Sequence, residues 1–254
     1  MYKTAMITGA TAGFGQAMAR SFSKLGYKLI LTGRRLERLE KLAMELATPV
    51  HIACFDVRSK VDLQQSLHQL PSEFHEVDVL INNAGLALGL EMADKADLQD
   101  WETMIDTNIK GLVYMTRALL PGMVERNRGH IINIGSIAGQ WPYPGGNVYG
   151  ATKAFVQQFS RNLRTDLFGT GVRVTNIEPG MAETEFSQVR FKGNKAKAQA
   201  VYEGCQPLSA DDIATLVAMV ATLPEHININ ALEVMPTTQS WAGLRTYRGA
   251  DTDK

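Results

Sequence analysis

The feature that most constrains this chain is a regular alternation of short apolar runs with longer helical patterns. The apolar runs lie at 3–8, 28–32, 50–55, 77–81, 129–134, 172–177 and 231–235. The helical patterns lie at 13–26, 35–47, 59–69, 98–126, 149–168 and 209–222. Nearly continuous apolar runs are typical of strands that are buried on both faces. Their alternation with helices through short connections favours a mostly parallel sheet covered by helices on both faces. With right-handed crossovers, the sequence predicts a doubly wound α/β fold with seven parallel strands.

Composition and charge narrow the possible partners. With 254 residues, of which 45% are hydrophobic, the chain can form one domain over 1–254. The formal net charge is zero, so nothing favours nucleic acid or an anionic membrane surface as a partner. There is no run of about 18 apolar residues, so no membrane span is expected. Cys54 and Cys205 have no metal-binding or redox spacing, and we expect a reduced, cytoplasmic protein without a metal site.

One polar segment, 180–207, interrupts the alternation. A connection this long inside a compact domain is usually functional or mobile, so it is a candidate lid over a substrate. A separate C-terminal tail is expected near 236–254.

A glycine-rich turn follows the first apolar run. It reads Gly9-Ala-Thr-Ala-Gly13-Phe-Gly15 and leads into a helical pattern. Glycines at a strand-to-helix turn let the backbone approach a diphosphate, and the helix N-terminus supplies amide donors. The spacing differs from the G-x-G-x-x-G fingerprint, and such turns also arise for conformational reasons alone. Its place after the first strand favours a dinucleotide site. The predicted contacts at this turn are Gly9, Thr11, Gly13, Phe14 and Gly15.

The end of the second apolar run indicates which dinucleotide binds. NAD enzymes usually carry an acidic residue there, whereas this chain has Gly33 followed by Arg34 and Arg35. The planar donors of arginine suit a 2′-phosphate. The alternative is that the two arginines merely begin a charged amphipathic helix. Together with the glycine turn, they favour NADP(H) over NAD.

Tyr149 and Lys153 lie one helical turn apart and therefore on one helix face. A nearby ammonium group can lower the pKa of a phenol, which would suit the pair to acid–base chemistry. Ser136 follows an apolar run and is placed to donate a hydrogen bond to a substrate oxygen. The alternative is an exposed tyrosine and lysine on an ordinary helix, and the pair alone does not decide between the two.

These parts occur with other motifs in a fixed order. The set is 9–15, Asn82-Asn-Ala-Gly85, Asn108, Ser136, Tyr149-Gly-Ala-Thr-Lys153 and Pro179-Gly180. In this combination the sequence resembles the classical short-chain dehydrogenases/reductases from residue 9 to about residue 237. The segments 101–108, 145–149 and 189–193 resemble the NADP-dependent 3-hydroxy acid dehydrogenases of that family, which act on serine, allo-threonine and malonic semialdehyde. The resemblance implies a Rossmann-like, three-layer α/β/α fold and a homotetramer.

The resemblance also implies roles for individual residues. Tyr149 is expected to act as the general acid in reduction and the base in oxidation, while Lys153 lowers its pKa and binds the nicotinamide ribose. Ser136 is expected to hold the substrate oxygen. Asn108 is expected to hold a water that links Lys153 to solvent. Further cofactor contacts are expected at Asp56, Val57, Asn82, Ala84, Gly85, Pro179, Gly180 and Thr184. Individually, Asn82 could be a turn residue, Asp56 a helix cap and Thr184 a lid residue without a contact.

A hydroxy acid substrate needs a cation for its carboxylate. Arg190 on the expected lid is the candidate, with Lys192 in support, and Gln140, Trp141 and Tyr143 are expected to shape the pocket. The alternative is that both lid cations are solvated. Two other functions are open: an NADPH-dependent reductase of ketones such as 3-oxoacyl thioesters, and a non-catalytic dinucleotide sensor. Arg190 disfavours the thioester, and the complete set of Ser136, Tyr149 and Lys153 disfavours the sensor.

Overall fold

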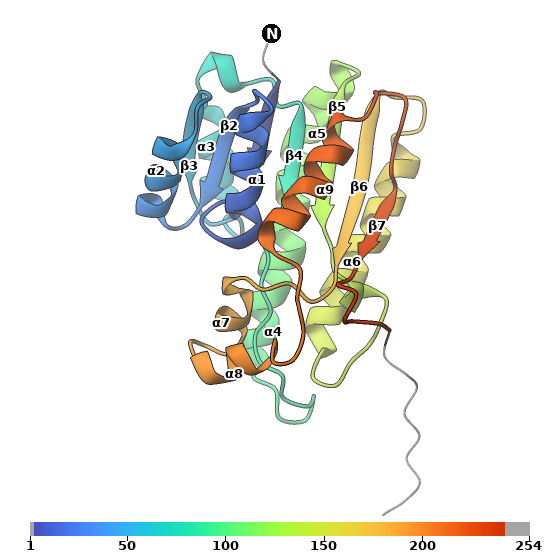
Figure 1. The fold of residues 1–254 in the computed structure, drawn as a ribbon. Helices are drawn as coiled ribbons and strands as arrows, with labels where there is room; N and C mark the ends of the chain where they lie inside the picture. The colour runs from blue at the N-terminus through green and yellow to red at the C-terminus, as the bar shows by residue number, and fades with distance from the viewer. Residues whose placement is uncertain (1–2, 242–254) are drawn as a thin grey trace, which may run out of the picture.

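The computed structural model describes residues 3–241 and contains one seven-stranded parallel sheet (Figure 1). The strands are β1 (Thr4–Ile7), β2 (Lys28–Gly33), β3 (Val50–Cys54), β4 (Val79–Asn82), β5 (Gly129–Ile134), β6 (Val172–Pro179) and β7 (Ala231–Val234). Their order in the sheet is β3-β2-β1-β4-β5-β6-β7, and every neighbouring pair is parallel. The order reverses between β1 and β4, which is the switch point where doubly wound sheets bind ligands. The predicted fold class is confirmed.

Helices cover both faces of the sheet (Figure 1). The longer helices are α1 (Gly13–Lys24), α2 (Leu36–Glu45), α3 (Lys60–His68), α5 (Leu112–Glu125), α6 (Asn147–Asp166) and α9 (Ala210–Thr222). The short helices are α4 (Leu98–Ile105), α7 (Glu185–Arg190) and α8 (Lys195–Ala200). Single turns lie at η1 (Ser72–Phe74) and η3 (Ile137–Gly139), and a π-helical segment, η2, lies at Asp106–Gly111. Within residues 3–241, no helix is both long enough and apolar enough to cross a membrane.

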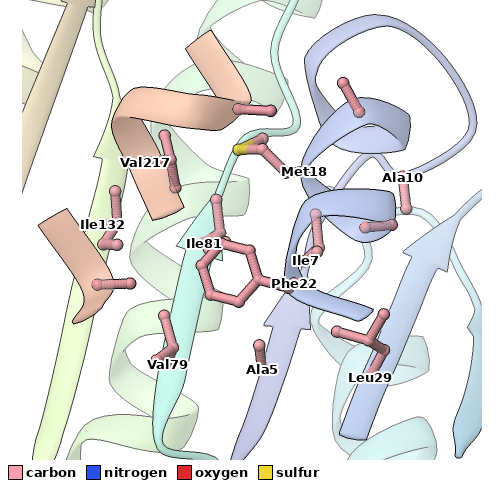
Figure 2. Close-up of a cluster of buried hydrophobic side chains, with 14 of the residues drawn as sticks. Ala5, Ile7, Ala10, Met18, Phe22, Leu29, Val79, Ile81, Ile132 and Val217 are labelled. Carbon is pink, nitrogen blue, oxygen red and sulfur yellow. The ribbon is translucent and has the colours of Figure 1, made fainter. Parts of the chain in front are cut away.

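Alternate side chains of each central strand enter two separate cores. Ala5 and Ile7 of β1 pack with α1, α2 and α9, whereas Met6 between them packs with α3, α5 and α6. Figure 2 shows the first core, where Phe22 of α1 and Val217 of α9 lie over the central strands. Because both faces are covered, central strands such as β1 and β4 are mostly apolar, whereas β6 also carries buried polar side chains, including Thr175 and Asn176.

Two segments differ from the helices that the sequence pattern predicted. The pattern at 98–126 forms α4 and α5, which are separated by the π-helical segment η2. The lid segment, 180–207, contains α7 and α8, which the sequence analysis did not predict. Thr184 and Asn194 are the N-caps of these two helices, and their side chains accept hydrogen bonds from the Phe186 and Lys197 amides. Both cap residues are visible in the sequence, but helices of six residues are too short to show an apolar period.

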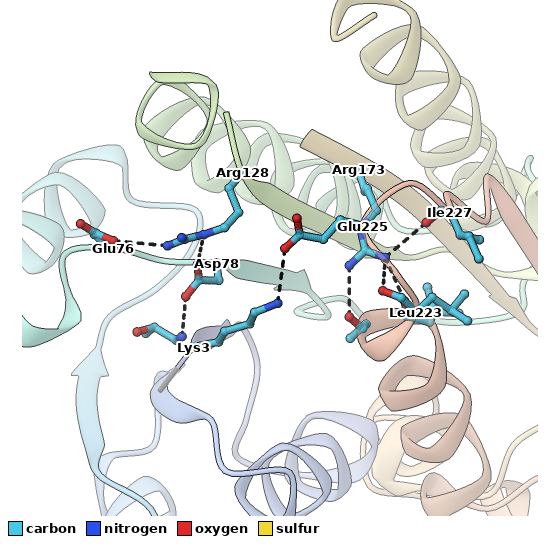
Figure 3. A network of polar contacts seen from close by, with 11 residues as sticks. Lys3, Glu76, Asp78, Arg128, Arg173, Leu223, Glu225 and Ile227 are labelled. Atoms are coloured by element: carbon cyan, nitrogen blue, oxygen red, sulfur yellow. Dashed lines mark hydrogen bonds and ion pairs between the residues drawn. The ribbon is translucent and has the colours of Figure 1, made fainter. Parts of the chain in front are cut away.

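Buried charges join the elements at the amino ends of the strands, opposite the glycine turn (Figure 3). The Asp78 carboxylate accepts hydrogen bonds from the Thr4 amide and the Arg128 Nε, both at 2.8 Å. The Arg173 guanidinium of β6 donates to carbonyl oxygens at the carboxyl end of α9, the shortest bond being 3.1 Å to Ala221. A cation at this position satisfies carbonyl groups that have no partner within the helix. This end of the sheet is therefore closed by its own side chains.

Candidate active site

A cavity of about 600 Å³ opens at the carboxyl ends of the strands, beside the switch point. Most residues predicted for the site line it. They are Gly9, Thr11, Gly13, Phe14, Arg34, Arg35, Asp56, Val57, Ala84, Gly85, Ser136, Tyr143, Tyr149, Lys153, Pro179, Gly180, Thr184 and Arg190. The predicted residues Gly15, Asn82, Asn108, Gln140 and Lys192 do not line it. Strand ends and the loops that follow them therefore bring together positions that are far apart in the sequence.

The backbone of the glycine turn packs closely because Gly9, Gly13 and Gly15 have no side chains. Gly9 and Gly13 have φ values of +67° and +51°, a region that favours glycine. A Cβ on Gly15 would lie 2.3 Å from the Gly9 carbonyl oxygen. Ala12 is the N-cap of α1 and supplies no side-chain cap, so no side chain blocks the first-turn amides of the helix. The turn therefore fits a diphosphate group.

Arginines surround the ends of β2 and β3. Arg35 donates from Nη2 to the Thr11 hydroxyl at 2.7 Å, and Arg34 lies 3.9 Å from the Asp56 carboxylate. Burial raises the pKa of Asp56, but hydrogen bonds from Arg58 and the charges of Arg58 and Arg34 outweigh it and leave that pKa below its usual value. The sequence analysis missed Arg58, although it stands two residues from Asp56. This cluster has an excess of positive charge, which fits a phosphate rather than a bare ribose.

Two predicted asparagines lie behind the cavity wall. Asn108, in the π-helical segment, accepts a hydrogen bond from the Leu86 amide and donates to the Leu86 carbonyl and the Thr152 hydroxyl, at 2.8 to 3.0 Å. Asn82 donates to side chains of α5 and β5 and is 4% exposed. The next residue, Asn83, lines the cavity and was missed. A cofactor contact for Asn82 and a water site for Asn108 stay predictions.

Ser136, Tyr149 and Lys153 meet at the floor of the cavity. Helix α6 carries Tyr149 and Lys153, which are 8% and 7% exposed, and Ser136 comes from the end of β5. The Lys153 Nζ donates to the Ile134 carbonyl oxygen at 2.8 Å and lies 5.9 Å from the centre of the Tyr149 ring. A Cβ on Gly139 would lie 2.7 Å from the Lys153 carbonyl carbon, so the loop after Ser136 packs directly on α6. This packing fixes the serine beside the tyrosine.

Burial shifts the pKa values of this pair in opposite directions. It raises the pKa of the Tyr149 phenol to about 12, against the lowering effects of a hydrogen bond with Ser136 and the charge of Arg190. Burial also lowers the pKa of the Lys153 ammonium group to about 8. The Arg190 guanidinium carbon lies 5.2 Å from the Tyr149 ring centre, and its charge lowers the phenol pKa. The lowering of the phenol pKa by Lys153 stays a prediction.

Arg190 forms the roof over the tyrosine. Its guanidinium carbon also lies 5.5 Å from the Tyr143 ring centre and 5.6 Å from that of Phe186, and Nη2 donates to the Tyr143 hydroxyl. The Arg190 Nε is buried and has no hydrogen-bond partner among residues 3–241. Because Arg190 also lines the cavity, its guanidinium group suits an anionic ligand there.

The other predicted substrate residues point elsewhere. The Lys192 Nζ lies 2.8 Å from the Asp100 carboxylate of α4. The Gln140 side chain accepts a hydrogen bond from Gln157 at 3.3 Å. Substrate contacts for Lys192 and Gln140 therefore have no support from this geometry and stay predictions.

Two tryptophans complete the wall: Trp141, which was expected to shape the pocket, and Trp241, which was not expected there. The indole nitrogens of Trp141 and Trp241 donate to the two carboxylate oxygens of Glu233 at 3.0 and 3.1 Å. Both tryptophans line the cavity. Trp241 belongs to the expected tail at 236–254, of which 242–254 lies outside the described residues.

Comparison with known proteins identifies the family. The sequence profile described as short chain dehydrogenase matches residues 3–195. The chain belongs to this family, as its motifs predicted.

The chain is 62% identical to the NADP-dependent 3-hydroxy acid dehydrogenase YdfG of Escherichia coli strain K12, over 96% of this chain and 98% of that protein. It is 56% identical to sulfoacetaldehyde reductase 2 of Chromohalobacter salexigens, over 96% of this chain and 98% of that one. A solved structure described as the closed form of serine dehydrogenase complexed with NADP+ is 61% identical and has a TM-score of 0.95, with 97% of this chain and 100% of that chain covered.

The glycine turn gives a first test of the site. Replacing Gly15 with alanine places a Cβ against the Gly9 carbonyl and must move the backbone, so we expect Gly15→Ala to weaken NADPH binding about tenfold or more. Fluorescence titration measures the affinity, and thermal unfolding checks the fold. The matched control is Gly122→Ala in α5, where the new Cβ meets only the flexible end of Arg126. Unchanged affinity in the Gly15 variant would contradict the diphosphate assignment.

Proposed function

We propose that this chain is an NADP-dependent dehydrogenase that interconverts 3-hydroxy acids with 3-oxo acids or semialdehydes. The substrates would be of the L-serine, L-allo-threonine and 3-hydroxypropionate type. One observation carries the proposal: Arg190 lines the cavity, its guanidinium group lies over the Tyr149 ring, and its buried Nε has no hydrogen-bond partner among residues 3–241. An anion-binding group beside a proton-transfer group fits a small substrate that carries both a carboxylate and a carbonyl or hydroxyl.

The residues at the dinucleotide end of the cavity fit NADP. The glycine turn and the N-terminus of α1 would hold the diphosphate, and Arg34 and Arg35 would hold the 2′-phosphate. Val57 and Ala84 line the cavity between the turn and the floor, where the adenosine and ribose groups would lie. When bound, the nicotinamide supplies or accepts the hydride.

The protein would hold and move the proton. In reduction, the Tyr149 hydroxyl would donate its proton to the carbonyl oxygen of the substrate, and in oxidation the phenolate would take it back. Ser136, at the same floor, would hold that oxygen as charge develops on it. With a pKa of about 8, the Lys153 ammonium group is charged in most molecules at neutral pH. This positive charge near Tyr149 would favour the phenolate form. Asn108 would extend the proton path to solvent through a water.

The substrate anion would bind under the lid segment. The three relatives are named for a hydroxy acid, for sulfoacetaldehyde and for serine, and each of these molecules carries a carboxylate or a sulfonate. Arg190 can meet either group through its guanidinium donors. A 3-oxoacyl thioester has no such anion beside its ketone, so Arg190 disfavours that alternative. A dinucleotide sensor would not need Ser136, Tyr149 and Lys153 at one floor.

Assembly and location form part of the same proposal. Apolar side chains remain exposed on the segment of α4 and α5, including Leu98 at 65% and Val124 at 39%. Helix α6 adds a stacked Phe155–Phe159 pair. These faces support a homotetramer, and free Cys54 and Cys205 support a reducing, cytoplasmic location. Light scattering after size exclusion should give about four times the 27.9 kDa chain mass, and a monomer mass would contradict the assembly.

Tyr149→Phe tests the proton step. The variant keeps the ring but lacks the hydroxyl, so we expect turnover to fall about 10²- to 10⁴-fold while NADPH affinity is retained. Initial rates with malonic semialdehyde and L-serine measure turnover, and fluorescence titration measures binding. An active variant would remove Tyr149 from its role.

Arg190→Ala tests the substrate anion. We expect the KM for L-serine to rise roughly 10- to 100-fold, because a charged hydrogen-bond partner is lost, and the KM for an uncharged ketone to change far less. Gln188→Ala, at an exposed position of the same helix, is the matched control. Equal effects on both substrates would contradict the assignment.

The same variant has a pH signature. The charge of Arg190 lowers the pKa of Tyr149, so its removal should raise that pKa and leave less phenolate at any given pH. The rise of the oxidation rate with pH should therefore move to higher pH in Arg190→Ala, and it should move less in Arg190→Lys, which keeps the charge.

A further inference from the structure

One contact between the lid segment and the dinucleotide side of the cavity is made by a carboxylate. Glu185 is the first residue of α7 and lines the cavity. Its carboxylate accepts hydrogen bonds from the Arg38 Nη1, at 2.8 Å to Oε1 and 3.0 Å to Oε2, and lies 3.3 Å from the Arg35 Nη1. Glu185 is about 150 residues away from these arginines in the sequence, so the contact joins two separate walls of the cavity.

A second contact lies directly beside this carboxylate. A Cβ on Gly13 would stand 3.3 Å from the Thr184 Cβ, so the start of the lid segment rests on the glycine turn. The N-cap bond from the Phe186 amide to Thr184 orients the first turn of α7. Together, Thr184 and Glu185 bring the lid segment across the part of the cavity where the diphosphate and 2′-phosphate would lie.

The two arginines have different positions. Arg35 lines the cavity and also binds Thr11, whereas Arg38, one turn into α2, does not line the cavity. A phosphate in the cavity can therefore engage Arg35 without reaching Arg38. Arg38 makes the shorter contacts with Glu185, at 2.8 and 3.0 Å, and can keep them while the phosphate is bound.

The Glu185 carboxylate is ionised at neutral pH. Burial raises its pKa, but hydrogen bonds and charge from Arg38 and Arg35 outweigh burial and leave the pKa below its usual value. The side chains of Glu185 and Arg38 are 42% and 47% exposed. An ion pair this exposed is weak and depends on salt, which suits a contact that forms and breaks in each catalytic cycle.

We propose that the Glu185–Arg38 ion pair is a latch that holds the lid segment over the bound dinucleotide and slows its release. Glu185 is then a positioning residue, which acts on the lid rather than on the reacting atoms. The proposal rests on NADP as the cofactor, from the proposed function. A different role would be direct repulsion between Glu185 and the 2′-phosphate. The two roles predict opposite changes in the rate of NADPH release when the carboxylate is removed.

Release kinetics separate these roles. In stopped-flow displacement experiments, Glu185→Gln should release both NADPH and NADH about 1.5- to 5-fold faster than the unmodified enzyme, because the latch does not require the 2′-phosphate. Slower release confined to NADPH would show repulsion and overturn the latch. Unchanged release of both dinucleotides would overturn it as well.

Matched variants isolate the ion pair. Arg38→Gln should also speed release, and the double variant should be no faster than Glu185→Gln alone, because Glu185→Gln already removes the contacts of this carboxylate with Arg38 and Arg35. Additive effects would contradict the pairing. Glu183→Gln is the control, since Glu183 is exposed, lies two residues away and has no ion pair within residues 3–241. At about 1 M salt, where screening acts within about 3 Å, release from the unmodified enzyme should approach that from Glu185→Gln.

A second measurement needs no dinucleotide. Lys195 and Lys197 of α8 are exposed on the lid segment and are sites for trypsin. Loss of the latch should speed trypsin cleavage there in the dinucleotide-free enzyme, and the Glu183→Gln control should be cut at the original rate. Equal cleavage rates would contradict the latch. If the unmodified enzyme failed to bind either dinucleotide, the proposed cofactor would fall, and the cleavage rates would still test the contact.

Discussion

The structure depends on one constraint: every strand is parallel and most strands are buried on both faces. A parallel ladder with covered faces favours apolar side chains along the strands, and buried polar side chains there, such as Asn133 and Thr175, bind other buried groups. Functional groups that face a cavity therefore collect where the strands end. The carboxyl ends all lie at one edge, and the order reversal between β1 and β4 opens a space there. Ser136 after β5, Asp56 after β3 and Pro179 at the end of β6 therefore share one cavity. At the opposite edge, the Arg128–Asp78 ion pair and the Arg173 contacts to α9 complete the hydrogen bonding and leave little space for a ligand.

Burial also sets the electrostatics of the candidate site. In a medium less polarisable than water the charged form of each group is disfavoured, so the Tyr149 and Lys153 pKa values move apart, to about 12 and about 8. A nearby cation opposes the rise of the Tyr149 pKa, although the phenol stays buried. Arg190 is the cation whose charge reaches Tyr149, and it belongs to the lid segment. The candidate acid–base group therefore lies against a residue of the lid segment.

Much of this architecture was predictable from the sequence because it depends on local patterns. Apolar runs gave the strands and their parallel arrangement, and the glycine turn could be recognised because Gly9, Gly13 and Gly15 each have a conformational or packing reason to lack a side chain. The contacts that the sequence analysis missed depend on distant parts of the chain. The Arg190 guanidinium group lies over the rings of Tyr143, Tyr149 and Phe186. The Glu233 carboxylate accepts hydrogen bonds from Trp141 and Trp241. Neither pairing leaves a period or a spacing in the sequence, so only the folded chain reveals it. The short helices α7 and α8 had visible caps but no apolar period to mark them.

The π-helical segment η2 sets how α4 and α5 are rotated relative to each other about the helix axis. In an α-helix each residue turns the chain by about 100°, and a wider π turn accommodates an additional residue, so the helix that follows is rotated relative to the helix before it. Helix α5 therefore directs Met115 and Met123 into the core against the sheet, while α4 directs Asp100 toward Lys192 of the lid segment. Asn108 lies within the segment that makes this change of phase, where its side chain binds the loop after β4 and the helix that carries the tyrosine. A regular helix from 98 to 125 would align one of these faces and misalign the other.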